Sequence, residues 1–222
     1  MTILKLNNIS KSFEQGKEKI NILNNLNLEL KERQSISIIG ESGCGKSTLL
    51  QIIGLLLSKD EGQIEICGNR IENQNDNYLS DIRLKYIGFI FQHHHLLADF
   101  TALENVIIPQ TLLGNNNQSA VKYAKELLEK LGLKDRMNFK PSELSGGQQQ
   151  RVAIARAMAN KPKLILADEP TGNLDPENTK IVSELFFNAV KETSASLVIV
   201  THNREISSQT QATYMLKAGK LN

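Results

Sequence analysis

The chain has 222 residues, enough for one α/β domain with a sizeable core or for a core with an added subdomain. Its 40% hydrophobic content, 23% charged content and formal net charge of +2 are ordinary for a soluble globular protein and give no electrostatic case for a nucleic-acid partner. The two cysteines make no disulfide framework, which fits a reducing compartment. No apolar run approaches the ~20 residues that a membrane-spanning helix needs.

The first ninety residues predict mainly strands. Residues 3–9 are typical of an edge strand, and we expect Phe13 to lie in a polar turn after it. Apolar residues alternate with polar ones over 20–30, which is the period of half-buried antiparallel strands. The β-branched run over 35–39 predicts a buried strand, and the helix after it is expected to run to about Leu57. Three further elements are expected: a strand over 63–67, a short helix over 78–84 and a strand over 86–91.

The pattern becomes helical between about residues 92 and 160, and the alternation of strands and helices then resumes. Helices are predicted over 119–131 and 147–159, with a loop over 114–117. The last part of the chain predicts a strand over 163–167, a helix over 177–191, a strand over 196–200, a short helix and a hairpin over 214–221. No linker divides the chain. We therefore expect one domain, in which 1–91 and 161–222 form the core and a β-subdomain and 92–160 form an inserted helical subdomain.

The segment after the strand over 35–39 has the composition of a phosphate-binding loop. Its residues are Gly40, Glu41, Ser42, Gly43, Cys44, Gly45, Lys46, Ser47 and Thr48. Glycines let backbone N–H groups approach phosphate oxygens, and the start of the following helix adds about half a positive charge. Lys46 can reach the β- and γ-phosphates, and the Ser47 hydroxyl is placed to ligate Mg²⁺. A flexible Gly/Ser turn is the alternative, and the strand before and the helix after the loop argue against it.

Two adjacent carboxylates, Asp168 and Glu169, end the apolar strand over 163–167. Ligands of open parallel sheets bind at the carboxyl ends of the strands. We therefore expect Asp168 to hold Mg²⁺ opposite Ser47, and Glu169 to polarise an attacking water. A solvated acidic turn is the alternative, and the phosphate-binding loop upstream makes it the weaker one.

A second potential anion site precedes the helix predicted over 147–159. It consists of Ser145, Gly146, Gly147 and Gln148, a hydroxyl and two glycines at a helix N-terminus. A second phosphate site in one domain makes sense if two copies meet head to tail, so that each closes over the nucleotide of the other. An ordinary helix cap at Ser145 is the alternative.

Taken in order, motifs along the whole chain resemble those of an ATP-binding cassette (ABC) ATPase. The matching positions are 40–47 (Walker A), Gln92 (Q-loop), 144–148 (signature), 164–169 (Walker B), 172–175 (D-loop) and His202 (switch histidine). The resemblance implies an α/β P-loop NTPase fold with a RecA-like core, an antiparallel β-subdomain and an inserted helical subdomain. It also implies a Mg²⁺-dependent ATPase that forms a homodimer on binding ATP.

The same resemblance implies roles for individual residues. Phe13 matches the aromatic residue that stacks on adenine, where Tyr is usual; a buried edge-strand aromatic is the alternative. Gln92 matches the residue that senses Mg²⁺ and the membrane partner, and Asp175 matches the residue that couples the two sites of the dimer. His202 matches the histidine at the γ-phosphate. With Glu169 as base and Lys46 on the phosphates, these residues complete the expected catalytic set.

Residues 94–97 (His-His-Leu-Leu) and 99–105 (Asp-Phe-Thr-Ala-Leu-Glu-Asn) are similar to the LolD family, the ATPase subunits of lipoprotein-releasing transporters of Gram-negative bacteria. This implies LolC- and LolE-like membrane subunits and a peripheral position on the cytoplasmic face of the inner membrane. Ala98 departs from the usual proline. Residues 167–175 are shared more widely, so an ATPase of the macrolide exporter (MacB) type or the cell-division (FtsE) type remains an alternative.

Two more distant interpretations also remain. A soluble cassette ATPase acting on DNA or ribosomes would need long insertions or a second cassette, which 222 residues do not provide. The run His93, His94 and His95 suggests a metal site, but adjacent side chains of an extended chain point to alternate faces and no Cys or carboxylate cluster completes a ligand set.

Overall fold

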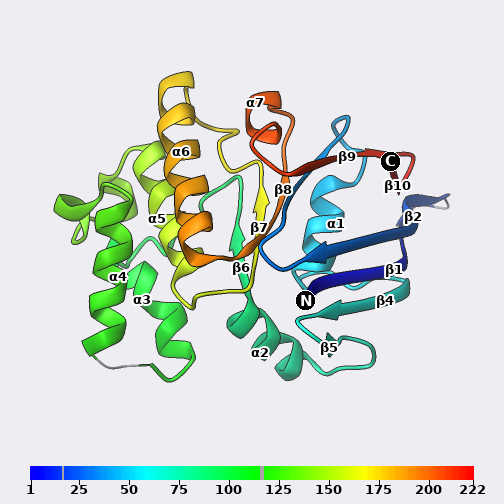
Figure 1. The fold of residues 1–222 in the computed structure, drawn as a ribbon, viewed down its shortest axis with the longest axis horizontal. Coiled ribbons are helices and arrows are strands. Elements are labelled where there is room, and N and C mark those ends of the chain that lie inside the picture. Colours follow the sequence, from blue (N-terminus) through cyan, green and yellow to red (C-terminus); the bar gives the residue numbers. More distant parts are fainter. Residues whose placement is uncertain (17, 116–117) are drawn as a thin grey trace.

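A six-stranded sheet forms the centre of the computed structural model, which describes residues 1–16, 18–115 and 118–222 (Figure 1). Its order is β10-β9-β3-β8-β7-β6, and every neighbouring pair is parallel except β10 and β9. The strands are β3 (Ser35–Ile39), β6 (Ile87–Ile90), β7 (Leu164–Asp168), β8 (Ser196–Val200), β9 (Ala212–Lys217) and β10 (Lys220–Leu221). β3, β7 and β8 are short runs of apolar and small residues because helices or the second sheet cover both faces of this sheet.

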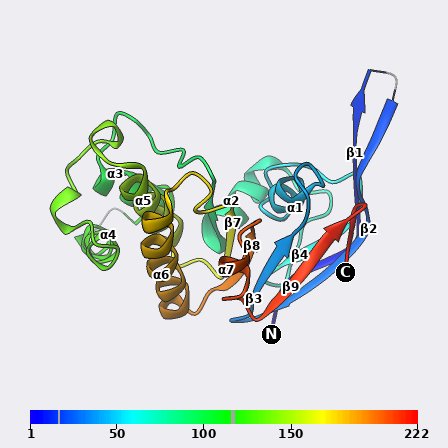
Figure 2. The ribbon, with the colours of Figure 1, turned by 90° about the horizontal axis from the view of Figure 1, so that it is seen from above.

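The second sheet has four strands in the order β2-β1-β4-β5, and all its pairs are antiparallel. Its strands are β1 (Thr2–Gln15), β2 (Glu18–Lys31), β4 (Glu61–Ile66) and β5 (Asn69–Arg70). Leu26, Leu28 and Leu30 are buried on β2 with exposed residues between them, so one face meets the core and the other meets solvent. The far ends of β1 and β2 project from the rest of the molecule (Figure 2).

The helices divide between the two faces of the central sheet. They are α1 (Lys46–Ile53), α2 (Asp76–Tyr86), α3 (Ala102–Leu112), α4 (Gln118–Lys130), α5 (Gly146–Met158), α6 (Pro176–Thr193) and α7 (Arg204–Ser207). Helices α3 to α6 gather on the side away from the antiparallel sheet (Figures 1 and 2). On β7, Leu164 and Leu166 belong to the apolar cluster that includes α1, whereas Ile165 and Ala167 belong to the cluster that includes α5 and α6.

The α/β class and the order of elements expected from the sequence are confirmed, with three corrections. Residues 3–9 belong to β1, which is not an edge strand because it pairs with β2 on one side and with β4 on the other. Phe13 lies in β1 opposite Ile20, and not in a turn. The pairing of β1 with β2 continues beyond Phe13 to Gln15 and Glu18, which are polar. Helix α1 ends at Ile53, short of Leu57, since Leu55 adopts a left-handed backbone conformation with φ 57°. The loop expected over 114–117 is described only at its first two residues, and the other two lie outside the described residues.

None of the helices in the described part of the chain combines the length and the apolarity that crossing a bilayer takes.

Candidate active site

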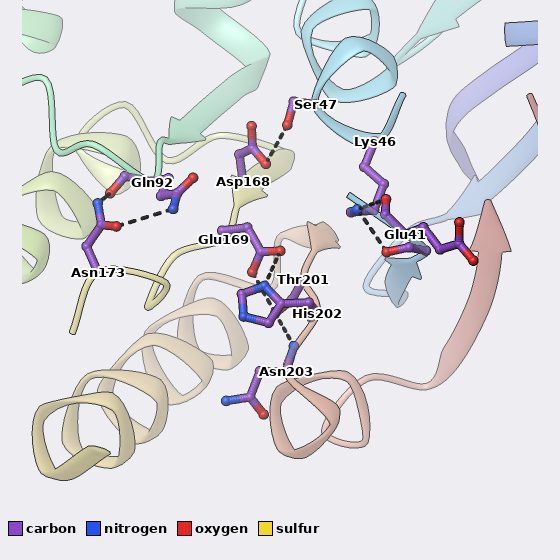
Figure 3. A network of polar contacts seen from close by, with 11 residues as sticks. Glu41, Lys46, Ser47, Gln92, Asp168, Glu169, Asn173, Thr201, His202 and Asn203 are labelled. Carbon is purple, nitrogen blue, oxygen red and sulfur yellow. Dashed lines mark hydrogen bonds and ion pairs between the residues drawn. The ribbon is translucent and has the colours of Figure 1, made fainter. Parts of the chain in front are cut away.

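The loop between β3 and α1 is shaped by glycines and by its own lysine. Gly45 precedes α1 with φ 102°, and a Cβ there would lie 2.5 Å from Cγ2 of Ile22. Only glycine therefore fits this turn. Lys46 donates hydrogen bonds from Nζ to the carbonyl oxygens of Gly40 (3.0 Å) and Glu41 (2.8 Å), so its ammonium lies across the loop (Figure 3). The loop thus forms a concave surface that combines backbone N–H groups with one positive charge.

This loop forms one wall of a pocket of about 400 Å³. The opposite walls carry Gln92, which follows β6, Asp168 and Glu169 at the end of β7, and His202, which follows β8. These strands are neighbours in the parallel sheet, and their carboxyl ends meet at one edge. The structure therefore brings together Lys46, Ser47 and the four residues of these walls, as the sequence suggested.

The Ser47 hydroxyl donates a hydrogen bond of 3.1 Å to Oδ1 of Asp168. Burial raises the pKa of the Asp168 carboxyl, while the Ser47 hydrogen bond opposes this shift. A carboxylate, a hydroxyl and the nearby Gln92 amide offer the hard oxygen ligands that Mg²⁺ prefers. A cation would also offset the cost of the buried charge on Asp168, so the residues present fit Mg²⁺.

Glu169 is held by two neighbours from the end of β8. Its Oε1 lies 2.8 Å from Nδ1 of His202, and its Oε2 accepts a hydrogen bond of 3.1 Å from Oγ1 of Thr201 (Figure 3). Thr201 is 1% exposed, whereas the side chain of His202 is 72% exposed. The carboxylate is therefore fixed from the buried side and still faces the pocket. The sequence reasoning missed Thr201, although a hydroxyl residue directly before His202 was the available signal.

Four of the predicted residues, Ser145 to Gln148, do not line this pocket. Ser145 is exposed and caps α5: its Oγ accepts from the Gln148 N–H (3.3 Å), and Oε1 of Gln148 accepts from the Ser145 N–H (2.9 Å). A helix cap is thus present, and Ser145 and Gly146 are exposed at the start of α5.

Phe13 and Asp175 also lie outside the pocket lining. The Phe13 ring is 42% exposed, and Lys11 Nζ lies 5.4 Å from its centroid, so the alternative of a buried aromatic residue is wrong. Asp175 caps α6 by accepting hydrogen bonds from N (3.0 Å) and Nδ2 (2.6 Å) of Asn178. These hydrogen bonds lower the pKa of the Asp175 carboxyl.

The three consecutive histidines face different neighbours. His93 contacts Asn173, His94 contacts the carbonyl oxygen of Gly146, and the His95 ring meets the Phe91 ring edge to face, with centroids 4.9 Å apart. Over the described residues, no group of three or more His, Cys, Asp or Glu side chains is arranged to hold a metal ion.

Known proteins match the chain along its length. A family model described as "ABC transporter" matches residues 23–172. The chain is 51% identical over 220 residues to the lipoprotein-releasing system ATP-binding protein LolD of Rickettsia bellii, covering 99% of this chain and 97% of the relative. It is 44% identical to the LolD protein of Treponema denticola, with the same two coverages.

Two solved structures are similar as well. One is a dimeric ATP-binding cassette in a post-hydrolysis state bound to ADP and Pi, and the other is a dimeric bacterial ABC transporter cassette. Each has a TM-score of 0.90 and 40% identity, and each match covers 99% of this chain and 97% of the other. The fold is therefore that of a P-loop ABC ATPase, and the chain belongs to the ABC transporter family of ATP-binding proteins.

Proposed function

We propose that this chain is the ATP-hydrolysing subunit of an ABC transporter that releases lipoproteins from the inner membrane toward a periplasmic carrier. The observation that best supports ATP hydrolysis is that one pocket is lined by Lys46, Ser47, Asp168, Glu169 and His202. The transported class is supported by the LolD relatives, which align over nearly the whole chain. Exporters of the MacB type and cell-division ATPases of the FtsE type are less favoured, as are ATPases acting on DNA or ribosomes.

Each group in the pocket has a task in phosphoryl transfer. The loop N–H groups and Lys46 bind the β- and γ-phosphates. Ser47, Asp168 and Gln92 hold Mg²⁺, which supplies positive charge that neutralises the phosphate oxygens. Glu169 takes a proton from the attacking water, since its carboxylate faces the pocket. His202 donates a hydrogen bond toward the γ-phosphate.

The remaining expected residues act around the nucleotide or at a dimer interface. In the functional homodimer, Ser145 to Gln148 of one copy close over the nucleotide held by the phosphate-binding loop of the other. The exposed Ser145 and the dimeric state of the similar structures support this arrangement. Asp175 couples the two sites across the interface, and the exposed Phe13 ring stacks on adenine. Residues 92–160 form the helical subdomain that carries the start of α5.

Dimer closure would act on two membrane subunits, LolC and LolE or two copies of one homologue. The ATPase would then lie peripherally on the cytoplasmic face of the inner membrane. A pull-down from detergent-solubilised membranes tests this assignment, with the co-purifying proteins identified. Recovery of lipoprotein-releasing subunits supports it, and recovery of a macrolide-exporter or cell-division partner contradicts it.

The catalytic assignment is tested with Glu169→Gln. This variant should bind ATP and dimerise stably but hydrolyse ATP about 10²- to 10⁴-fold more slowly, because it lacks the general base. Glu184→Gln, an exposed change on α6, is the matched control and should keep the wild-type rate. Near wild-type hydrolysis by Glu169→Gln would mean that another group is the base.

A further inference from the structure

The residues that follow β6 connect the pocket to the loop before α6. Gln92 donates from Nε2 to Oδ1 of Asn173 (3.2 Å), and Asn173 donates from Nδ2 to the carbonyl oxygen of Gln92 (3.1 Å), as Figure 3 shows. Nδ2 of Asn173 also lies 3.4 Å from Nδ1 of His93. The pocket residue Gln92 is thus held against the loop that leads to Asp175.

The next residue, His94, reaches the start of α5. Its Nε2 lies 2.9 Å from the carbonyl oxygen of Gly146. A carbonyl oxygen can only accept, so Nε2 carries the hydrogen. Gly146 is the first residue of α5 and directly follows Ser145, so this bond fixes the backbone beside the hydroxyl that the dimer uses.

A second contact aligns the same segment with α5. Arg156 donates from Nη2 to the carbonyl oxygen of His94 (2.9 Å) and from Nη1 to that of His95 (2.6 Å). Arg156 lies ten residues beyond Gly146, about 15 Å along the helix. The segment is therefore attached to α5 at two separated points. The bond from the His94 side chain to Gly146 is the one at the N-terminal end of α5, where the signature residues lie.

From these contacts we infer that His94 is a positioning residue that couples the two nucleotide sites of the dimer. It lies two positions after Gln92 of its own pocket, and its side chain bonds the residue next to Ser145, which serves the partner's pocket. This inference rests on the head-to-tail dimer of the proposed function. It has a distinctive consequence: loss of the bond impairs the partner's site and spares the chain's own site.

Two substitutions isolate the hydrogen bond. His94→Gln places an amide Nε2 where the imidazole Nε2 lies, whereas His94→Phe keeps a ring of similar size without a donor. In the transporter purified with its membrane subunits, His94→Phe should lower kcat five- to tenfold with little change in KM for ATP. His94→Gln should keep at least half of the wild-type kcat. Equal activity of both variants, at any level, would overturn the inference.

Mixed dimers give the deciding measurement, followed as a single turnover of pre-bound ATP. In the trans arrangement, one chain carries both His94→Phe and Glu169→Gln, so the only hydrolysing site combines a wild-type pocket with the altered chain's Ser145. In the cis arrangement, His94→Phe and Glu169→Gln lie on different chains. The reference is the mixed dimer in which one chain carries Glu169→Gln alone. Relative to it, the single-turnover rate of the trans dimer should be five- to tenfold lower, and the rate of the cis dimer should be unchanged. A lower rate in the cis dimer, or an unchanged rate in the trans dimer, contradicts the inference.

The same design with Ser145→Ala in place of His94→Phe separates this inference from the dimer on which it rests. If Ser145→Ala acts in trans and His94→Phe does not, the role of His94 alone is overturned. If Ser145→Ala also fails to act in trans, the head-to-tail dimer is overturned as well.

Discussion

The buried Thr201 hydroxyl donates a 3.1 Å hydrogen bond to Oε2 of Glu169 and accepts one of 3.0 Å from the Asn203 N–H. The residue is 1% exposed, so its side chain has little freedom to turn away. The other Glu169 oxygen faces the largely exposed His202 side chain. Thr201 is therefore the fixed point that sets the direction of the proposed catalytic carboxylate.

Replacing Thr201 by valine keeps the volume and removes both hydrogen bonds of the hydroxyl. We expect Thr201→Val to lower kcat for ATP hydrolysis about tenfold, since loss of one orienting bond is worth about 1.4 kcal/mol. KM for ATP should change less than twofold, because Thr201 does not line the nucleotide pocket. Thr201→Ser restores the donor and should recover most of kcat. A valine variant with wild-type kcat would contradict this role.

Substitution of Asp168 should separate stability from function. Burial raises the pKa of its carboxyl, so the charged form is disfavoured in the folded protein. The resulting cost is present at neutral pH and disappears as the pH falls through the raised pKa. Without nucleotide, Asp168→Asn should therefore raise the Tm at pH 7 by about 2 °C. Mg²⁺ with ATP should stabilise the wild type but stabilise the variant much less.

Differential scanning calorimetry with and without Mg²⁺ and ATP measures both effects. Asp81→Asn, a change at an exposed site on α2, is the matched control and should leave both Tm values unchanged. Equal stabilisation of the wild type and Asp168→Asn by Mg²⁺ and ATP would exclude Asp168 as a ligand.

The Asp60 carboxylate stabilises the β1–β4 region in a pH-dependent way. Hydrogen bonds from Lys11 and then Ser12 lower its pKa from 3.8 to about 2. Because the folded-state pKa is the lower one, the stabilisation is complete above about pH 4 and is lost as the pH falls through about 2. Asp60→Asn should cost about 0.5–1 kcal/mol at pH 7, since the pair is partly exposed to solvent.

Urea denaturation between pH 2 and pH 7 measures this contribution. Lys11→Met should cause a similar loss at pH 7, and the double variant should lose less than the sum because the two changes remove one interaction. Additive losses would show that the two side chains stabilise the fold independently.

The exposed Phe13 ring should contribute to nucleotide affinity. Stacking of a base on an aromatic ring is worth about 1–3 kcal/mol, so Phe13→Ala should raise Kd for ATP about tenfold. Phe13→Tyr retains the ring and should bind as the wild type does. Titration of the two variants with ATP checks this, and an alanine variant with unchanged Kd would remove Phe13 from the nucleotide site.

The sequence predicted the sheet and the pocket well because both depend on local patterns. The short run Ser196–Val200 was expected as a strand at these bounds, since few other arrangements bury five consecutive residues of this kind. Lys46, Ser47 and Asp168 converge because strand ends of a parallel sheet meet at one edge. Local chemistry therefore sufficed to place them.

Other features depend on pairings that the local residue pattern does not show. Phe13 is in a strand because Ile20 and its neighbours pair with it, and a polar composition alone favours a turn. The Gly146 carbonyl oxygen that receives the His94 hydrogen bond is 52 residues away. No periodicity in the chain marks such a contact, so the role of the histidine run could be derived only from the structure.

Glu169 adopts φ 44°, in the left-handed region that glycine occupies without strain. A glutamate there costs about 1 kcal/mol or more relative to a relaxed backbone. If folding alone decided the residue at this position, glycine would be the better choice. The protein thus retains a locally unfavourable backbone where it places its proposed base, and selection for thermal stability alone would be expected to enrich an inactive chain.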